Sequence, residues 1–132
     1  MRSSSQLLGK VIDADIRTVI YDGDADYICN YRGIENMINF LSNKCQTKYL
    51  STPWTSWTVD GVATGQFKSA GNVSNVRISQ CVCHPKSRIG IHLDSSRSGH
   101  MVAAYTIGNL PYGKHALTMY NQAMAGKPIS SM

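Results

Sequence analysis

The sequence predicts an incomplete α/β fold, the C-terminal portion of a domain in which helices flank a mostly parallel sheet. Three observations support this. Residues Ile16 to Tyr21 form a run rich in β-branched side chains, bounded by Asp15 and Asp22-Gly23, as a buried strand would be. A segment with helical periodicity follows from Gly33. The chain has 132 residues, whereas a parallel sheet needs helices from a longer chain to cover both its faces.

The predicted helix begins near Gly33 and ends near Ser42-Asn43. Its apolar residues recur at positions i, i+3, i+4 and i+7, which places them in one stripe on one face: Ile34, Met37, Ile38 and Leu41. We interpret this stripe as core.

The middle of the chain predicts a hairpin and a further strand. Trp57–Val59 and Val62–Phe67 flank Asp60-Gly61, a strong signal for a two-residue hairpin turn. Asn75 to Ile78 is predicted as another short strand.

The C-terminal region predicts one more helix, roughly Tyr112 to Ala125, which ends at Gly126-Lys127-Pro128. Its apolar residues on one side are Leu117, Tyr120 and Met124. We expect residues 129–132 to form a frayed tail.

Composition excludes several classes of protein. The formal charge is +5, but the thirteen basic residues are scattered without a run of five, so we expect no nucleic-acid partner. No apolar stretch approaches eighteen residues, and the polar segment after Met1 does not resemble the apolar core of a signal peptide. We therefore expect neither membrane insertion nor an export signal within the chain.

No metal site is expected, and four cysteines are too few for a disulfide-dense scaffold. Asp22, Asp24 and Asp26 imitate a calcium loop, but Tyr27 stands where that loop needs Gly, and Gly33 where it needs Glu. The cysteines of the chain are Cys29, Cys45, Cys81 and Cys83. The segment Cys81-Val82-Cys83-His84, with His92, lacks zinc-ligand spacing and an evident fourth ligand. Asn72-Val73-Ser74 is a glycosylation sequon, which has meaning only in a secreted chain.

An acid followed by a histidine is the most informative pair in the chain. Asp26 lies in a turn at the C-terminal end of the predicted strand, where open α/β sheets bind ligands. His100 lies far downstream in Gly99-His100-Met101-Val102. A carboxylate on the far ring nitrogen fixes the tautomer of a catalytic histidine and stabilises the imidazolium. The order nucleophile, acid, histidine is that of α/β-hydrolases, but no G-x-S-x-G occurs. We interpret His84, His92 and His115 as non-catalytic.

The segments Thr18–Gly33 and Ser98–Val102 resemble the two signatures of the serine carboxypeptidase family of vacuolar type, which are α/β-hydrolases. The resemblance implies that Asp26 is the triad acid and His100 the general base. It also implies that Ile28 and Cys29 line the pocket for the residue before the scissile bond, and that Met101 borders the leaving-group pocket.

The resemblance covers nearly the whole chain and matches the C-terminal third of a typical member, so we predict one segment of a serine carboxypeptidase domain over 1–132. Residues 79–97 depart from it: the family has only a few residues there, and a structureless excursion of this length is uncommon in a compact domain. We interpret 79–97 as an atypical insertion, such as a retained intron or a mis-joined gene model. Ala103 also departs, since members usually have Pro there.

The resemblance implies proteolysis that releases C-terminal amino acids from peptides or proteins, in a secreted or vacuolar location and without a cofactor. Because the nucleophile segment is missing, we expect the isolated chain to be inactive. Two alternatives stay open: a catalytically inactive module that binds a partner through uncovered apolar faces, and a carboxypeptidase-like acyltransferase.

Overall fold

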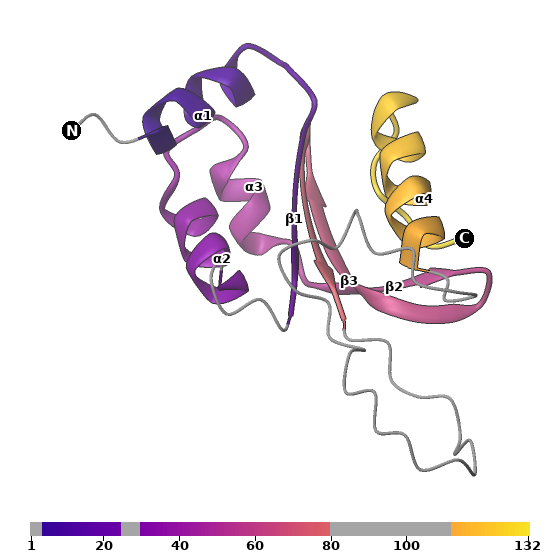
Figure 1. The fold of residues 1–132 in the computed structure, drawn as a ribbon. Helices are drawn as coiled ribbons and strands as arrows, with labels where there is room; N and C mark the ends of the chain where they lie inside the picture. The colour runs from indigo at the N-terminus through magenta and orange to yellow at the C-terminus, as the bar shows by residue number, and fades with distance from the viewer. Residues whose placement is uncertain (1–3, 25–29, 80–111) are drawn as a thin grey trace, which may run out of the picture.

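The computed structural model describes residues 4–24, 30–79 and 112–132, and within these ranges the side chains of residue 4 and of 112–115 are not described. Within these residues, four strands form one sheet in the order β1-β4-β3-β2 (Figure 1). The elements are α1 (Ser4–Asp13), β1 (Thr18–Gly23), α2 (Tyr31–Phe40), α3 (Gln46–Ser51), β2 (Thr55–Val59), β3 (Val62–Ala70), β4 (Val73–Ile78) and α4 (Tyr112–Met124).

The sheet is mixed, which corrects the expectation of a mostly parallel sheet for the part that is described. Only the β1–β4 pairing is parallel, whereas β4–β3 and β3–β2 are antiparallel. Tight turns cause this. Asp60 and Gly61, with φ of 53° and 77°, join β2 to β3, and Gly71, with φ of 60°, lies in the short link from β3 to β4. The predicted hairpin at Asp60-Gly61 is confirmed.

Parallel pairing of β1 with β4 joins segments that are 55 residues apart, from Thr18 opposite Val73 to Gly23 opposite Ile78. Backbone hydrogen bonds continue beyond both ends. The Thr18 N–H donates to Asn72 O at 2.8 Å, and the Asp24 N–H donates to Ile78 O at 3.0 Å. The relative register of these two strands is therefore fixed along their whole length.

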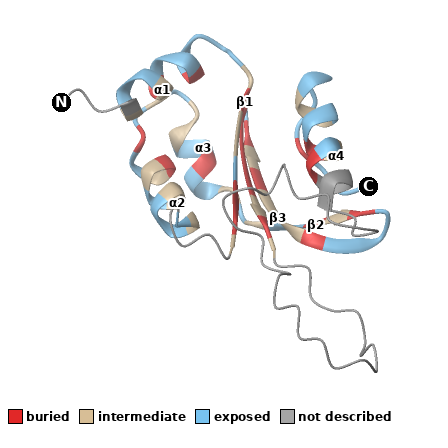
Figure 2. Cartoon of the chain, in the orientation of Figure 1, coloured by how far each residue is buried: buried red, intermediate tan, exposed pale blue. Residues whose placement is uncertain are grey.

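Helices cover both faces of the sheet and bury two apolar clusters (Figures 1 and 2). On one face, α1, α2 and α3 pack on the sheet, and the buried residues there are Ile12, Ile38, Leu41, Tyr49, Ala70 and Val73. On the other face, α4 and the C-terminal tail pack on the sheet, with Trp57, Val59, Val76, Ile78, Met119 and Ile129 buried. Alternation along β4 explains the division, because successive side chains of a strand point to opposite faces.

The element boundaries differ from the predicted ones by about two residues. β1 covers 18–23, not 16–21, because Asp15 takes a left-handed conformation with φ of 62° and Ile16 is 55% exposed. α2 begins at Tyr31, where the side chain of Asn30 accepts a hydrogen bond from the Arg32 N–H as the N-cap. Its predicted core stripe is confirmed, since Ile34, Met37, Ile38 and Leu41 all belong to the cluster under α1–α3.

Two helices, α1 and α3, were not predicted. α1 buries Ile12 and packs Leu8 inward, four residues apart, while Leu7 is 64% exposed. Because α1 has only ten residues, its apolar repeat extends over too few turns to give a clear helical signal in the sequence. α3 has six residues and buries a single large side chain, Tyr49, so its sequence carries almost no periodic signal.

The C-terminal region corrects two expectations. The stripe of Leu117, Tyr120 and Met124 faces solvent, and α4 instead buries Ala116 and Met119. Residues 129–132 are held in place and do not form a frayed tail. Ile129 is 1% exposed in the core, and the Ser131 hydroxyl donates to Ser56 O at 3.0 Å while accepting from the Thr58 N–H at 3.1 Å.

A Schellman motif ends α4 and directs this tail back toward the sheet. Gly126 has φ of 68°, its N–H donates to Ala123 O, and the Lys127 N–H donates to Gln122 O. The predicted termination at Gly126 is confirmed, and its geometry brings Ile129 onto the sheet.

The close approach of β3 to β4 generates a stability prediction at Gly65. A Cβ at Gly65 would lie 2.0 Å from Arg77 O, whereas a Cβ at Gly33 in α2 would meet no atom within 4 Å. We expect Gly65→Ala to lower the free energy of unfolding by more than about 3 kcal/mol, and Gly33→Ala to raise it by roughly 0.5–1 kcal/mol through helix propensity. Urea unfolding midpoints measure both changes in stability. Similar effects of the two substitutions would contradict the close backbone approach of β3 to β4 at Gly65.

Asn72 of the sequon has a structural role that generates a second prediction. Its Nδ2 donates to Ile12 O and to Ile16 O, both at 2.9 Å, and its Oδ1 accepts from the Cys45 thiol at 3.2 Å. We expect Asn72→Ala to lower the free energy of unfolding by about 1–2 kcal/mol, because the two hydrogen bonds from Nδ2 to Ile12 O and Ile16 O are lost. The exposed Asn36 provides the control, for which Asn36→Ala should change the unfolding midpoint little.

Candidate functional site

The edge of the sheet where β1 and β4 end is the candidate site. Because these two strands are parallel neighbours, the segment after Gly23 and the segment after Ile78 leave the sheet side by side. The first contains the predicted triad acid and the second leads toward the predicted histidine. An edge formed by the carboxyl ends of adjacent parallel strands is where open α/β sheets bind ligands.

The predicted site residues themselves, Asp26, Ile28, Cys29, His100 and Met101, lie outside the described residues. Their roles and mutual distances stay predictions. What the structure describes is the framework on either side of the acid turn, from Asp24 before it to Asn30 after it.

The entrance to the acid turn is fixed by hydrogen bonds. Asp22 is buried on β1, and its Oδ1 accepts from the Gly23 N–H at 2.8 Å. The Asp24 N–H then donates to Ile78 O at 3.0 Å, which extends the pairing of the two strands by one step. Immediately after β4, the Ser79 N–H donates to Thr64 O at 2.9 Å. The two strands therefore keep their alignment up to Asp24 and Ser79.

The exit from the turn is fixed by the start of α2. Asn30 caps the helix, with its side chain accepting from the Arg32 N–H at 2.9 Å and its carbonyl accepting from the Gly33 N–H at 2.8 Å. The residues between Asp24 and Asn30 must therefore span two anchored points.

Arg77 joins this exit to β4. Its Nε donates to Glu35 Oε1 at 2.9 Å, its Nη2 forms an ion pair with the same oxygen, and its Nη1 donates to Gln66 at 3.3 Å. The guanidinium also lies 4.5 Å from the ring centroid of Tyr31 and 5.0 Å from that of Trp54. A single side chain on β4 thus contacts the first residue of α2, its fifth residue and the segment before β2.

A second polar group lies under the same helices. Tyr49 Oη accepts a hydrogen bond from Asn75 at 3.2 Å, and the ammonium of Lys68 lies 4.4 Å from the Tyr49 ring centroid. Burial raises the pKa of Tyr49 and lowers the pKa of Lys68, and the nearby charge of Glu35 opposes the effect on Lys68. These groups lie between the sheet and α1–α3 and are not part of the candidate site.

Arg77 and its partners form what we call the Arg77 cluster: Arg77, Glu35, Gln66, Tyr31 and Trp54. Sequence reasoning missed this cluster. A signal was present, since Glu35 lies on α2 and Arg77 one residue before the end of a predicted strand. Their contact could not be inferred without knowing that β4 pairs with β1 beneath α2.

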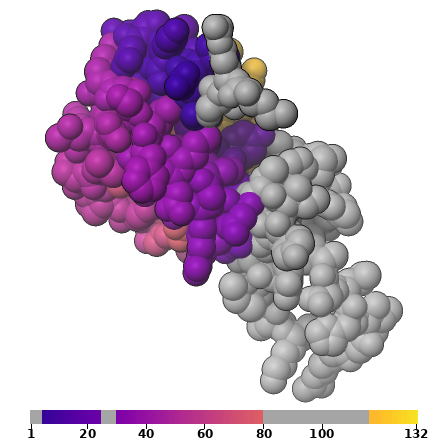
Figure 3. All heavy atoms as spheres, turned by 90° about the vertical axis from the view of Figure 1, so that its left-hand side faces the viewer, coloured from indigo at the N-terminus to yellow at the C-terminus, as the bar shows by residue number. Residues whose placement is uncertain are grey.

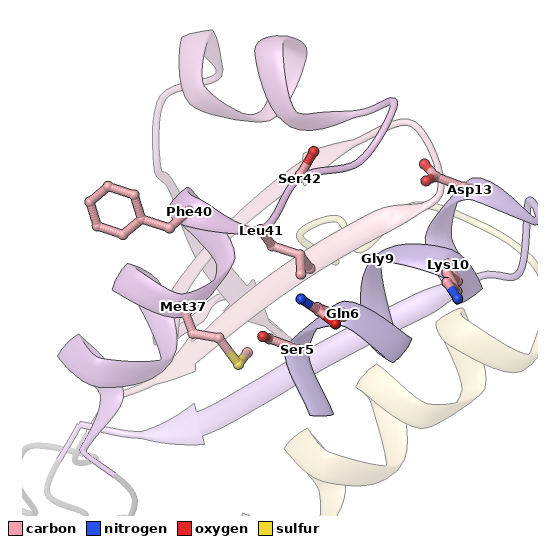
Figure 4. A pocket seen from close by; sticks show the side chains of 9 residues that line it. All are labelled: Ser5, Gln6, Gly9, Lys10, Asp13, Met37, Phe40, Leu41 and Ser42. Carbon is pink, nitrogen blue, oxygen red and sulfur yellow. The ribbon is translucent and has the colours of Figure 1, made fainter. Parts of the chain in front are cut away.

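A pocket of about 520 Å³ between α1 and the end of α2 is separate from this edge. Figure 4 shows its lining, in which Met37 and Leu41 point toward Ser5 and Gln6, while the ring of Phe40 points away from α1. The backbone approaches closely here, because a Cβ on Gly9 would lie 2.7 Å from Ser42 O.

Among the residues that the structure describes, no group of three or more His, Cys, Asp or Glu side chains could hold a metal ion. In the same part of the chain, no helix has the length and apolar character to cross a membrane.

Comparison with known proteins adds an independent line of argument. A family model described as serine carboxypeptidase matches residues 1–85. Carboxypeptidase S1 of Penicillium janthinellum is 28% identical over 130 residues, which is 98% of this chain and 25% of that protein.

Two further relatives match shorter parts. A pheromone-processing carboxypeptidase of Coprinopsis cinerea is 38% identical over 76 residues, 58% of this chain and 12% of the relative. Carboxypeptidase Y homolog A of Leptosphaeria maculans is 32% identical over 117 residues, 86% of this chain and 17% of the relative. The chain thus spans between 7% and 25% of the length of these and similar curated relatives.

The Arg77 cluster predicts a stability difference between two ion pairs. The side chains of Arg77 and Glu35 are only 23% and 21% exposed, whereas those of Lys44 and Asp15 are 42% and 79% exposed. We expect Glu35→Gln to lower the free energy of unfolding by about 1–3 kcal/mol, and Asp15→Asn by less than about 0.5 kcal/mol. Both changes are near-isosteric, and Asn tolerates the left-handed conformation of position 15. Urea unfolding provides the measurement, and equal losses would mean that burial does not strengthen the Arg77 pair.

Proposed function

The chain belongs to the serine carboxypeptidase family, and from that premise we propose that it supplies the acid and the histidine of a serine carboxypeptidase active site, as the C-terminal portion of an α/β-hydrolase fold. Asp26 is the proposed acid and His100 the proposed general base. The observation that carries the proposal is the parallel pairing of β1 with β4, because it starts the two proposed catalytic segments from adjacent strand ends.

In the proposed mechanism, a serine from a segment outside this sequence attacks the last peptide bond of a polypeptide. His100 accepts the serine proton and donates it to the leaving amine, while Asp26 orients the imidazole and stabilises its charged form. The acyl-enzyme is then hydrolysed and the shortened peptide is released. Ile28 and Cys29 would contact the residue before the scissile bond, and Met101 would contact the departing residue.

The framework around the acid turn suits this task. A catalytic carboxylate must hold its position within a fraction of an ångström, about 0.5 Å. The turn that contains Asp26 is bounded by the Asp24–Ile78 hydrogen bond on one side and by the capped start of α2 on the other. Arg77 connects the second anchor to β4, so both anchors are joined to the β1–β4 strand pair.

Family membership also supports a proposed secreted or vacuolar location and peptide or protein C-termini as substrates. Acyl transfer would use the same acid and histidine, and no described side chain favours it over hydrolysis. The partner-binding alternative has one supporting observation, since Leu117, Tyr120 and Met124 on α4 are 56–69% exposed.

The proposal predicts no turnover by the 132-residue chain alone. Removing the nucleophile of a serine protease lowers kcat by about 10⁶. We therefore expect no release of C-terminal residues from a blocked dipeptide. Turnover that disappears in His100→Ala would show that the chain carries a nucleophile of its own, and turnover that survives it would indicate a contaminant.

The predicted contact between Asp26 and His100 can be measured without turnover. A proton shared between a carboxylate and an imidazole resonates far downfield in the proton spectrum. We expect such a signal in the wild-type chain, its loss in Asp26→Asn, and its retention in the control Asp94→Asn. A spectrum unchanged by Asp26→Asn would separate the two residues and remove the basis of the proposed dyad.

A further inference from the structure

The glycosylation sequon Asn72-Val73-Ser74 lies where the short link from β3 enters β4. In the described sheet, β4 is an inner strand between β1 and β3. Val73 is paired with Thr18 on one side and with Ala70 on the other. Sequons that accept sugars normally lie in surface loops, where the transferase can reach the asparagine amide and the hydroxyl two residues later. Here the second and third residues of the sequon are held in the sheet instead.

Both protons of the Asn72 amide form hydrogen bonds within the fold. Nδ2 donates to Ile12 O in the last turn of α1 and to Ile16 O before β1, each at 2.9 Å. The Oδ1 atom accepts from the Cys45 thiol at 3.2 Å, and the main-chain carbonyl accepts from the Thr18 N–H at 2.8 Å. Asn72 is partly exposed, so the contacts of its amide, and not its depth, decide whether it can carry a sugar.

A sugar on Nδ2 would take the place of one of these carbonyl oxygens. In N-glycosylation, a bond forms between Nδ2 and the sugar carbon C1, the bond from C1 to the diphosphate of a lipid-linked sugar donor breaks, and Nδ2 loses one proton. One proton remains, so one of the two hydrogen bonds must break. A C–N single bond is about 1.45 Å long, so C1 would lie about midway between Nδ2 and an oxygen that is 2.9 Å away. The backbone of α1 or of the start of β1 would therefore have to move.

The carbonyl of Ile12 is held in place from the other side. Ile12 is fully buried, and Asp13 next to it accepts two hydrogen bonds from Lys44, one from the main-chain N–H at 2.8 Å and one from the ammonium at 3.1 Å. The atoms of α1 adjoin those of the segment that contains α2 and α3 (Figure 3). Moving α1 away from Asn72 would disturb this packing as well.

The hydroxyl of the sequon is also engaged. Ser74 is fully buried, and its Oγ accepts from Arg17 Nη2 at 2.8 Å and shares a hydrogen bond with the Ser69 hydroxyl. Both groups that define the sequon, the amide and the hydroxyl, therefore take part in the native hydrogen bonding.

We infer that the fold closes this sequon, so that the native chain has an unmodified Asn72 even after passage through a compartment where N-glycosylation takes place. A sugar at Asn72 and the native packing of α1 against the β1–β4 pair exclude each other. The inference is independent of the proposed catalytic role, because the sequon lies at the N-terminal end of the strand pair and the candidate site lies at the other end. The proposed secreted or vacuolar location gives it a consequence, since chains that receive a sugar at this position would not reach the folded state.

The test compares two sequons in one molecule. Asp60→Asn combined with Val62→Thr creates a second sequon in the exposed turn between β2 and β3, where the φ of 53° at position 60 suits asparagine. The chain is expressed in yeast with a secretion signal, and mass spectrometry measures the sugar occupancy of both positions in the protease-resistant, folded fraction. We expect occupancy at position 72 to be lower by about tenfold or more, because a sugar there breaks a native hydrogen bond and displaces backbone. A folded fraction with a sugar at position 72, at an occupancy comparable with that at position 60, would overturn the inference.

A destabilised variant separates the effect of the fold from that of the local sequence. Gly65→Ala, whose Cβ would clash with Arg77 O, should weaken folding without changing either sequon. When it is added to the double variant, we expect the occupancy at position 72 in the whole cell extract to rise toward that at position 60. An occupancy at position 72 that stays low would mean that the local sequence excludes the sugar in any state of the chain, and the role given to the fold would be wrong.

Hydrogen exchange tests the same geometry in the wild-type chain without any glycosylation. Both Nδ2 protons of Asn72 donate to backbone carbonyls, whereas Asn36 on α2 is exposed. In the ¹⁵N-asparagine-labelled chain, we expect the side-chain amide protons of Asn72 to exchange with deuterium at least about tenfold more slowly than those of Asn36. Equal exchange rates would show that the Asn72 amide opens to solvent as readily as an exposed one, which contradicts the inference.

Discussion

The parallel pairing of β1 with β4 is the constraint on which the rest of the structure depends. It joins two segments 55 residues apart, and the loop-closure entropy of that contact has to be recovered by the packing that it permits. With the pairing in place, Val19, Val76 and Ile78 present an apolar surface to α4, while Ile20 and Val73 present one to α1–α3. Without it, neither set of helices would have a complete face to cover.

Side-chain hydrogen bonds secure both ends of this pair in different ways. At the N-terminal end, Asn72 ties the turn before β4 to the carbonyls of Ile12 and Ile16, so that α1 and the start of β1 are placed together. At the C-terminal end, Arg77 joins β4 to Glu35 and to the ring of Tyr31, so that α2 is placed where the acid turn must finish. The two ends of one strand pair thus position α1 and α2 on the same face of the sheet. The start of α2 in turn fixes the end of the proposed catalytic turn.

Elements with strong local signals were predictable from the sequence. The hairpin at Asp60-Gly61 depends on two residues that take positive φ, and the stripe of α2 depends on a repeat visible over two turns. The buried face of α4 could not be predicted, because Leu117, Tyr120 and Met124 form the more conspicuous apolar stripe, whereas Ala116 and Met119 are the residues that are buried. Nor could the role of Ile129, since it follows a glycine and a proline and reaches the core only because the Schellman turn reverses the chain. For the candidate site, the sequence identified the segments that leave the two strand ends, while the Arg77 cluster required the three-dimensional pairing.

Two arginines show how differently one residue type is used at the two ends of the same strand pair. Arg77 gives all three of its nitrogens to acceptors and stacks on two rings, so its charge is compensated within the chain. Arg17 gives one nitrogen to acceptors, and the part of the chain that the structure describes offers no acceptor to the other two. Moving a charge out of water costs several kcal/mol, roughly, and the acceptors around a buried charge recover part of that cost. A chain of this size has a total stability of only about 5–15 kcal/mol. Desolvation of the guanidinium therefore costs more at the Arg17 end of the strand pair than at the Arg77 end. On the face beneath α1–α3, side-chain hydrogen bonds from Asn72 and Arg77 tie the helices to both strand ends.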